Sequence, residues 1–492
     1  MRKSAQAPEL PDRLDLEKNA AIETTATEPP THPTSATVEL EPHEEPTNWS
    51  APKKWSATIV IVLMTANITF ASSIHTAAIS GVSHSFGVSK TVATLPVTTF
   101  LLGFATGPLL FAPLSEVLGR TLIFRVVLGL FCCFNLGCAL APNVEALLVL
   151  RFLCGFFGAP TVTNSGGSLA DIWPQSQRSV PFALFTTGSS LGPVVAPIVG
   201  GFVAERLSWR WQYWIVTFVS GAVYVAMLFA LPETYATVLL QWKKKKAGIR
   251  PARMSFKERY ANDLTRPWIM LFTEPILFTL GLYSALIWGI LYLDFTAYPV
   301  VFQQDRHWSQ GKAGLSFIGI GIGMLIATMS SPWINDLHGK VVQKIGSKPE
   351  ARLPHLIFLA WFIPIGLFWF GWTAPPGTPA LVPIAAGIPF GIGFVTLFLG
   401  TNAYLSDCYG RFSASAWAAN AVLRSLFSAG FPLFARQMYL RMGTRWATTT
   451  LAITTVALAP VPWVLWRCGA WLRARSRFHL RTMELENMAD RG

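Results

Sequence analysis

The sequence predicts an all-α membrane protein with 12 transmembrane helices in two six-helix halves. Three observations lead to this fold class. Only 13% of the 492 residues are charged and 52% are hydrophobic, whereas an average soluble domain carries about 25% charged residues. The apolar residues form blocks of about twenty, the length that a helix needs to cross about 30 Å of hydrocarbon. A long basic stretch in the middle of the chain separates the first six blocks from the last six.

Short polar joints separate the blocks and define the expected spans. Because their number is even, both chain ends lie on the same side of the membrane. The spans are residues 55–78, 92–114, 121–141, 146–170, 180–203, 212–231, 272–302, 314–334, 354–373, 380–404, 413–438 and 446–466.

The distribution of basic residues indicates which side of the membrane holds the termini. With both termini inside, 28 of the 39 Lys and Arg residues lie in interior segments, seven in exterior loops and four within spans. Cytoplasmic loops carry the excess of Lys and Arg in membrane proteins, so we expect both termini to be cytoplasmic. The net charge of +13 therefore reflects topology at a membrane face, and it does not indicate a nucleic-acid partner.

The segments outside the spans complete the expected domain organisation. Residues 1–50 form an acidic cytoplasmic tail, rich in Thr and Pro, that we expect to be disordered. Residues 51–231 form the N-terminal half, and residues 232–267 form a basic cytoplasmic linker with the run KKKK. Residues 268–466 form the C-terminal half, and residues 467–492 form a basic cytoplasmic tail.

The inner loops of the two halves repeat one another. PLSEVLGR (113–120) follows the second span, and PWINDLHGK (332–340) follows the eighth. The fourth span ends in LAD (169–171), and the tenth ends in LSD (405–407). Parallel halves related about the membrane normal are a known transporter design, in which substrate is held near the midplane between them.

Charges in these loops predict an inner gate in each half. An acid, a glycine turn and a base at a helix end can pair with a carboxylate that caps a neighbouring span. The alternative is that these are solvated loop charges that only follow the topology rules. The predicted gate residues are Glu116, Gly119, Arg120 and Asp171 in the first half and Asp336, Lys340, Asp407 and Arg411 in the second.

A set of ordered motifs runs through both halves. The first half contains GPLLFAPLSEVLGR (107–120), RFLCGFFGA (151–159), GSSLGPVVAPIVGG (188–201), WRWQYW (209–214) and LPETY (231–235). The second half contains EPI (274–276), GLSFIGIGIG (314–323) and ASAWAANAVLRSLFSAGFPLFARQMY (414–439). Together they resemble the major facilitator superfamily, and more narrowly its twelve-span drug:proton antiporters of the fungal multidrug and toxin efflux type.

The resemblance covers about residues 50–470 and implies a function. It implies the major facilitator fold and a multi-pass protein of the plasma membrane that exports small amphipathic organic compounds in exchange for protons by alternating access. One loop departs from the family pattern: Glu116 and Val117 stand where the family often has Asp and Arg, and Thr121 and Leu122 replace basic residues. We therefore expect fewer interactions between charged residues in that loop than in the broader superfamily.

Two ionisable residues lie at similar depth in the outer half of the predicted spans. A charge at membrane depth costs about 2.5–3.5 kcal/mol on insertion scales. Arg151 and Asp294 each lie about seven residues, or roughly 10 Å, outward of the midpoint of their span. The resemblance links an arginine at the Arg151 position to proton transfer and places both spans at the central cavity. We expect Arg151 to pair with Asp294, which would carry the proton; the alternative places Asp294 simply at the exterior interface.

A third charge and several polar residues predict the wall of a substrate cavity. Arg424, near the middle of the eleventh span, either binds substrate or holds helices through backbone carbonyls. An aromatic wall with scattered hydrogen-bonding groups suits bulky amphipathic molecules, whereas ordinary helix packing is the alternative for each residue. The predicted cavity residues are Asn67, His75, Tyr283, Trp288, Tyr292, Asn402, Asn420 and Arg424.

The fifth span carries a stripe of small residues at positions 188, 192, 196 and 200, with prolines beside it. Small residues let membrane helices approach closely, and neighbouring helices satisfy the backbone groups that prolines free. We expect this helix to form the sliding contact between the two halves, and the resemblance associates the block with antiporters. The predicted residues are Gly188, Gly192, Pro193, Pro197, Gly200 and Gly201.

The remaining expectations concern function class and partners. The sequence shows no metal-spaced His/Cys cluster, nucleotide loop or nucleophile elbow, so we expect no enzyme activity and no cofactor or metal. The expected partners are a small-molecule substrate, protons and the lipid bilayer, with the protein acting as a monomer. An uptake symporter for a small nutrient or polyamine on the same fold is the alternative function.

Overall fold

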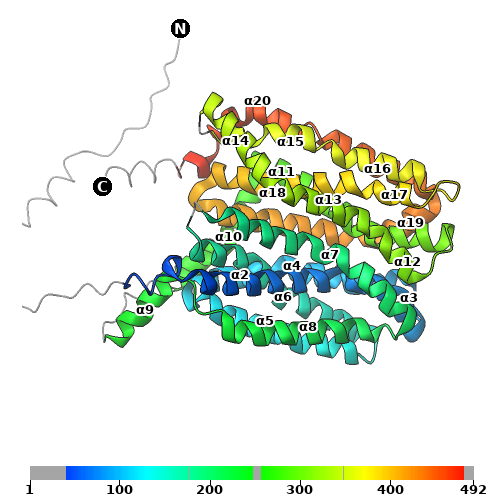
Figure 1. Cartoon of the computed structure of the whole chain (residues 1–492), viewed down its shortest axis with the longest axis horizontal. Helices are drawn as coiled ribbons and strands as arrows, with labels where there is room; N and C mark the ends of the chain where they lie inside the picture. The colour runs from blue at the N-terminus through cyan, green and yellow to red at the C-terminus, as the bar shows by residue number, and fades with distance from the viewer. Residues whose placement is uncertain (1–39, 175–176, 248–255, 347, 481, 483–492) are drawn as a thin grey trace, which may run out of the picture. The chain divides into compact units, whose positions relative to one another are not determined.

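The computed structural model describes residues 40–174, 177–247, 256–346, 348–480 and 482. These residues form helices joined by short loops (Figure 1), and the described ranges contain no β-strand. The absence of strands follows from the bilayer, because a helix satisfies its backbone hydrogen bonds within one segment and an open strand does not.

The N-terminal half consists of six long helices. The first begins as an α-helix, tightens into a 3-10 turn and continues as a short third segment. In chain order the elements are α2 (Ala51–Ser73), η2 (Ile74–Ala78), α3 (Ile79–Phe86), α4 (Lys90–Leu118), α5 (Arg120–Leu140), α6 (Val144–Ile172), α7 (Ser179–Arg206) and α8 (Arg210–Ala230).

The C-terminal half repeats this plan with more interrupted helices. Its elements are α11 (Pro275–Pro299), η4 (Val300–Asp305), α12 (Gln310–Gly314), η5 (Leu315–Phe317), α13 (Ile318–Met329), α14 (Ser331–Ile345), η6 (Pro349–Arg352), α15 (Pro354–Leu359), α16 (Phe362–Thr373), α17 (Leu381–Ala385), α18 (Gly387–Tyr409), η7 (Gly410–Phe412), α19 (Ser413–Leu458) and α20 (Val461–Arg473).

The described residues contain 11 helical segments that are long and apolar enough to cross a membrane, and the last of them, Ser413–Arg473, is two spans in one. Gly443 interrupts it with a left-handed backbone (φ 73°, ψ 157°). The Tyr439 hydroxyl lies 3.0 Å from the hydroxyl oxygen of Thr448, whereas nine residues of straight helix would separate them by about 13.5 Å. The chain therefore reverses there, and the predicted fold class of 12 transmembrane helices is confirmed.

Matching helix pairs reveal the duplication of the two halves. In the first half, a Cβ atom on Gly103, Gly107 or Gly155 would collide with a backbone carbonyl oxygen of the facing helix, so α4 and α6 touch backbone to backbone. In the second half, Gly323 and Gly391 place α13 and α18 in the same relation. The second and fourth spans of each half thus pack alike, through small residues.

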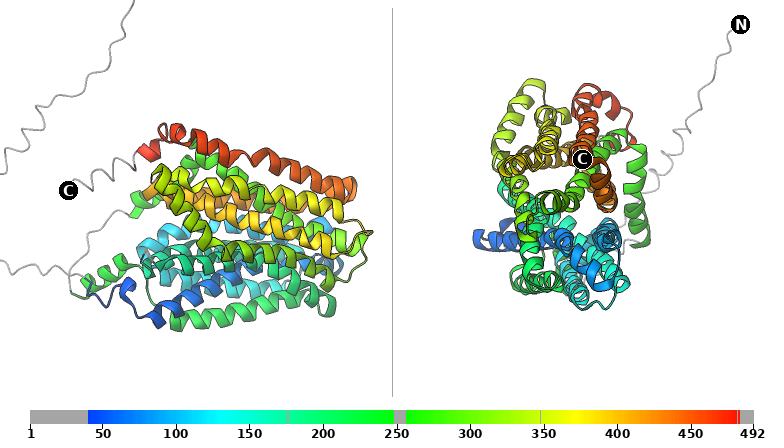
Figure 2. Two further views of the ribbon diagram at one scale, coloured as in Figure 1. Left: turned by 45° about the horizontal axis from the view of Figure 1, so that its top comes forward. Right: turned by 90° about the vertical axis from the view of Figure 1, so that its right-hand side faces the viewer.

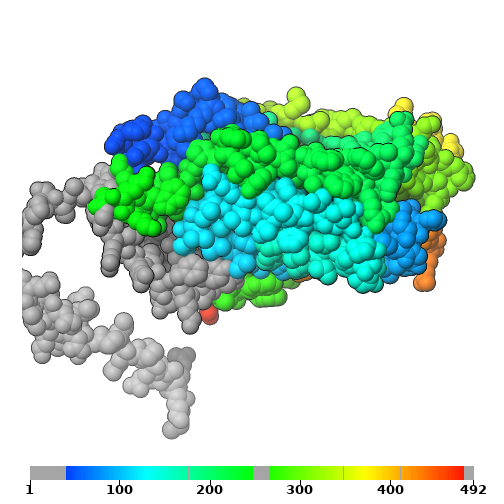
Figure 3. Space-filling view, turned by 90° about the horizontal axis from the view of Figure 1, so that it is seen from below, coloured from blue at the N-terminus to red at the C-terminus, as the bar shows by residue number. Residues whose placement is uncertain are grey.

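The two halves lie side by side, with the first in blue to green and the second in green to red (Figures 1 and 2). They meet where α4 packs against α19 and where α7 packs against α12 and α13. Large apolar side chains such as Phe229, Leu381 and Met329 are largely exposed on the outside. Figure 3 shows the face that the first half presents. Such a surface requires lipid around it.

The predicted linker holds two helices in its described part, α9 (Ala236–Lys246) and α10 (Phe256–Thr273). The Lys243 ammonium lies 2.7 Å from the carboxylate of Glu44, at the entry to the first span. This hydrogen-bonded ion pair lowers the pKa of Glu44 and raises that of Lys243. The expected domain boundaries and the cytoplasmic position of these segments stay predictions, and residues 1–39 and 483–492 of the predicted tails lie outside the described residues.

Candidate transport site

A cavity of about 400 Å³ lies between the two halves. It is lined from both sides, by α2, α4, α6 and α7 of the first half and by α11 and α19 of the second. Its wall combines hydroxyl groups, aromatic rings and one guanidinium group. The lining residues are Thr69, Ser72, Leu101, Phe104, Val162, Ser189, Trp288, Tyr292, Arg424, Ser425 and Ser428.

Arg424 is the charged residue of this wall. Its guanidinium carbon lies 4.5 Å from the ring centroid of Trp288 and 4.9 Å from that of Phe398. Among the described residues it makes no hydrogen bond or ion pair. The ring of Tyr292 stacks beside that of Trp288, with centroids 6.5 Å apart. The cavity therefore presents an aromatic platform with a cation above it.

A second pocket of about 820 Å³ lies one helical turn further along the same helices. Where Ser72, Tyr292 and Ser428 line the central cavity, Thr76, Phe295 and Pro432 line the second pocket. The hydroxyl groups of Ser72 and Tyr292 are 2.6 Å apart. They join the two halves at the boundary between the central cavity and the second pocket. We call the second space the outer pocket, because the predicted topology places it toward the exterior.

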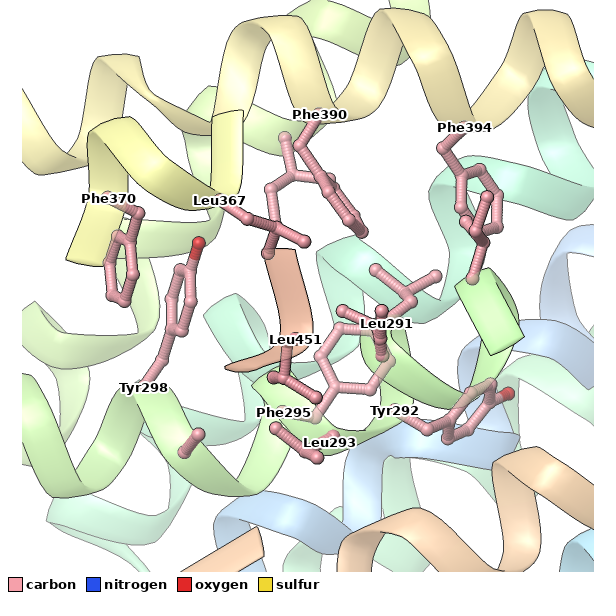
Figure 4. Close-up of a cluster of buried hydrophobic side chains, with 14 of the residues drawn as sticks. Leu291, Tyr292, Leu293, Phe295, Tyr298, Leu367, Phe370, Phe390, Phe394 and Leu451 are labelled. Carbon is pink, nitrogen blue, oxygen red and sulfur yellow. The ribbon is translucent and has the colours of Figure 1, made fainter. Parts of the chain in front are cut away.

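Further hydrogen bonds join the two halves around the outer pocket. The Thr98 hydroxyl donates to the Ala429 carbonyl (2.7 Å), and the backbone N–H of Gly311 donates to Glu205 (2.8 Å). Phe295 and Tyr298 belong to the buried hydrophobic cluster of the second half, where Tyr298 stacks on Phe370, and Tyr292 lies at the edge of this cluster (Figure 4). These hydrogen bonds close the halves against each other beyond the central cavity.

The inner gate predicted for the first half is present in part. The Arg120 Nε donates to Asp171 (2.9 Å), and Gly119 has the left-handed turn (φ 100°) that separates α4 from α5. Glu116 lies half-buried in the last turn of α4. Sequence reasoning did not count Glu233, although it lies in the LPETY segment. Its carboxylate accepts the backbone N–H groups of Arg120 (3.0 Å) and Thr121 (3.1 Å), and so caps the N-terminus of α5.

The prediction for the second half was wrong for two of its residues. Asp336 and Lys340 are exposed on α14 and form no ion pair among the described residues. The reason is that Gly339 continues the helix, whereas Gly119 turns the chain, so the repeated sequence does not repeat the geometry. Asp407 instead accepts from Arg352 (2.9 Å). The side chain of Arg411 lies outside the described part of the structure.

A buried ion pair that the sequence did not indicate closes the second half. Both carboxylate oxygens of Glu350 accept from Arg473 Nη2 at 2.7 Å, and Arg473 Nε adds a further bond of 2.9 Å. The residue Glu350 is only 5% exposed. Because the partners are 123 positions apart, local motif reading has no signal that could have found the pair.

The predicted pairing of Arg151 with Asp294 was wrong. The guanidinium of Arg151 is fully buried and donates to three backbone carbonyls: those of Ala71 (3.0 Å), Ser72 (3.3 Å) and Pro96 (3.2 Å). The change from α2 to the 3-10 turn η2 leaves carbonyls without helical partners. Arg151 thus stabilises the break in the first span, and it forms no ion pair with Asp294.

Asp294 is buried in a different environment. It is 2% exposed and makes no hydrogen bond or ion pair within the described ranges. The groups that interact with it electrostatically are the hydroxyls of Tyr298 and Tyr439. A proton-carrying role for Asp294 stays a prediction.

Three of the predicted cavity residues line the central cavity, namely Trp288, Tyr292 and Arg424. The others pack within the halves, as in the alternative interpretation. The Asn67 amide donates to Ser220 (2.8 Å), and His75 bonds to the Ala93 carbonyl (2.8 Å) and the Tyr213 hydroxyl (2.5 Å). The remaining three, likewise outside the lining, are Tyr283 and Asn420, which are buried, and Asn402, which is half-buried.

The difference between the lining residues and the packed residues has a geometric cause. Trp288 and Tyr292 are four residues apart and share one helix face, whereas Asn67 lies on a face of α2 that is turned toward α8. The hydroxyl residues Ser72, Ser189, Ser425 and Ser428 were missed because Ser carries no sequence signal that separates a cavity wall from a helix contact.

The small-residue stripe of α7 does not contact the other half, so that prediction was wrong for its main residues. A Cβ on Gly192 would lie 2.8 Å from the Ala66 carbonyl, and one on Gly200 would lie 3.0 Å from Ala77. Gly188 likewise faces Val62 of α2. The stripe therefore packs the fifth span against the first span of the same half.

The contact between halves uses the adjacent face of α7. A Cβ on Gly201 would lie 2.7 Å from the Gln310 carbonyl, and one on Gly314 would lie 2.7 Å from the Pro197 carbonyl. Pro193 lies beside the first span of the same half, where its carbonyl accepts from the Ser73 hydroxyl (2.7 Å). Positions 197 and 201 follow the stripe by one residue, which rotates them by about 100° on a helix.

Twelve membrane-crossing helices in two repeated halves, with a cavity at their interface, define the class of protein: a multi-pass membrane transporter. Residues 61–432 match the model of the Major Facilitator Superfamily, and the chain belongs to that family. It is therefore a member of a transporter family and not an enzyme.

The relatives and solved structures agree with this assignment. The chain is 43% identical over 447 residues to the major facilitator superfamily multidrug transporter mdrA of Aspergillus fumigatus, covering 88% of this chain and 74% of that protein. It is 41% identical to the MFS-type efflux pump MFS2 of Trichophyton rubrum, covering 88% and 75%. The fold matches the xylose transporter XylE from E. coli with a TM-score of 0.62, at 17% identity, covering 85% and 98%.

Proposed function

We propose that this protein is a proton-coupled antiporter that exports small amphipathic organic compounds across the plasma membrane, with both termini in the cytoplasm. The observation that carries the proposal is the cavity between the halves, which combines aromatic rings, hydroxyl groups and one cation. Relatives with about 40% identity are named multidrug transporter and efflux pump, which supports the outward direction.

The geometry suggests how the halves move as units. Within each half, backbone-to-backbone contacts and the ion pairs Arg120–Asp171 and Glu350–Arg473 hold the helices together. Between the halves, the contacts at the outer pocket are hydrogen bonds and small-residue contacts. Alternating access then breaks the contacts between the halves and keeps the contacts within each half, as in other transporters built from two repeats.

Asp294 is the proposed proton carrier. A charged carboxylate at membrane depth requires a partner or a proton, and none of the described residues supplies a partner. Opening of the outer side would expose the region of Tyr298 and Tyr439 to external water, so that Asp294 can gain a proton there. Opening of the inner side would then release it while substrate enters.

Export is tested in a yeast host that lacks its own drug pumps. Cells that express the protein are loaded with a panel of amphipathic compounds, and intracellular content is followed with and without a protonophore. We expect lower content only when the proton gradient is intact, and the Asp294→Asn variant should show no such difference. Higher content in expressing cells would contradict export and favour uptake, and protonophore-insensitive export would remove the proton from the mechanism.

A further inference from the structure

The charge of the central cavity is one-sided. Among its eleven lining residues Arg424 is the only ionisable cation, and no Asp or Glu is present. The outer pocket one turn away is lined by Lys90 and Arg436, again without a carboxylate. A cationic substrate would meet only like charge among the lining residues of these two spaces. The electrostatics of both spaces favour an anion.

Arg424 has hydrogen-bonding capacity that the protein leaves unused. A guanidinium carries five N–H donors, and among the described residues those of Arg424 find no acceptor. The group lies over the ring faces of Trp288 and Phe398. Arg151 provides the comparison, since three carbonyls accept from it. A planar fork of free donors in a cavity fits a carboxylate, which it binds with two parallel hydrogen bonds.

The hydroxyl groups around Arg424 strengthen this fit. The Ser428 oxygen is buried and has no hydrogen-bond partner. Ser428 lies one helical turn from Arg424 on α19, so both point to the same space. An orphan hydroxyl beside a free guanidinium is complementary to the oxygens of one carboxylate, since a buried polar group without a partner is unfavourable.

Aromatic and apolar side chains form another part of the cavity wall. Trp288 and Tyr292 form a stacked pair whose planes differ by 24°. The opposite wall carries Leu101, Phe104 and Val162. A ring placed between these walls gains apolar burial and aromatic contact, while its carboxylate reaches Arg424.

We propose that the central cavity selects ionised amphipathic monocarboxylates, with the carboxylate on Arg424 and Ser428 and the aromatic or apolar body against Trp288, Tyr292 and Phe104. Lys90 and Arg436 of the outer pocket then attract the anion once the Ser72–Tyr292 contact opens. This substrate class rests on the proposed function only for the direction of transport, because the binding itself needs no gradient.

Two probes of the same size test the substrate class: naphthalene-2-carboxylate and its uncharged carboxamide. Their binding to the purified full-length protein in lipid nanodiscs at pH 7 is measured by titration calorimetry. We expect the carboxylate to bind about tenfold more tightly or better, the range of a charge-assisted hydrogen bond. Arg424→Gln should bring the ratio of the two affinities close to one, and Arg424→Lys should keep part of it.

The matched control is Arg445→Gln. Arg445 lies over Trp372 at 4.7 Å, the same cation–ring arrangement, but on the exposed surface, so its loss should leave the affinity ratio unchanged. Ser428→Ala removes one oxygen without touching a charge and should weaken carboxylate binding by about threefold to tenfold. It gives an answer even where Arg424→Gln fails to fold.

Three results would overturn the substrate class: equal affinities for the two probes in the wild type, no binding of the carboxylate, or an unchanged ratio in Arg424→Gln. Export of neutral compounds together with equal probe affinities would overturn the substrate class and leave the proposed function intact. Selective carboxylate binding without gradient-dependent export of any compound would overturn the proposed function and leave the substrate class intact.

Discussion

Two arginines at membrane depth, one in each half, differ in the hydrogen bonds that their surroundings offer. Arg151 is fully buried and donates to three carbonyls of the first and second spans. Arg424 lines the central cavity and has no acceptor among the described residues. The same side chain thus fastens helices in the first half and stays open to a ligand in the second. The acceptors within reach, and not the residue type, decide which role a membrane arginine has.

The largest expected effect on stability distinguishes the arginine that joins helices from the arginine that faces the cavity. Arg151→Leu removes three hydrogen bonds from a buried charged donor, at about 1–3 kcal/mol each, so we expect the free energy of unfolding to fall by about 3 kcal/mol or more. Arg424→Leu should change it by less than about 1 kcal/mol, because no hydrogen bond is lost. Thermal unfolding of the purified variants in detergent measures both. Equal destabilisation by the two substitutions would show that the comparison is false.

The next comparison is between the two ion pairs at the inner end of the second half. Glu350→Gln removes the negative charge of the buried ion pair with Arg473. Breaking a buried ion pair costs up to about 3–5 kcal/mol. Asp407→Asn weakens a pair whose side chains are 30% and 35% exposed, which is worth about 0–1 kcal/mol. Unfolding midpoints should therefore separate the variants clearly. A larger effect at Asp407 would contradict this ranking.

Glycine substitutions on α7 sharpen the distinction between contacts inside a half and contacts between halves. Gly192→Leu forces a side chain against the backbone of α2 and should destabilise the first half by about 1–3 kcal/mol, with a lower yield of monodisperse protein. Gly201→Leu presses on Gln310 of the other half, so each half should remain folded while transport falls. Yield and transport measured on both variants check this. Normal yield with lost transport at Gly192 would restore that position as a sliding contact.

The last comparison is between the two repeated loop sequences. Gly119 has φ 100°, and a Cβ there would lie 2.5 Å from Glu233, so Gly119→Ala should lower the free energy of unfolding by about 1–3 kcal/mol. Gly339 lies inside α14 with open space around it. Gly339→Ala should therefore be neutral or stabilising by about 0.5–1 kcal/mol. Denaturation of the two variants under one condition gives the sign directly.

The fold was accessible from the sequence because it depends on a property that each segment carries by itself. Apolar blocks of about twenty residues determine the spans, and the predicted limits of 121–141 differ from α5 (Arg120–Leu140) by one residue at each end. The reversal at Gly443 follows from a short polar joint between two apolar blocks. These features need no knowledge of which helix lies beside which.

The site was only partly accessible, for reasons that particular residues illustrate. Arg120 and Asp171 could be paired because both close the same kind of loop in neighbouring spans. Arg151 and Asp294 share a similar depth, but depth does not tell which way a side chain points. Glu350 and Arg473 meet across 123 positions, and the orphan Ser428 is one of several serines in apolar helices.

By itself the sequence determined that the chain crosses the membrane twelve times, in two related halves of a known transporter family. Only the tertiary structure decided which small-residue face of α7 meets the other half, which acids and bases pair, and which arginine remains free. Spans depend on the transfer of a single helix from water to lipid, which composition describes. Pairing depends on helix rotation and packing, where one residue turns a side chain by about 100° and gives it a different neighbour.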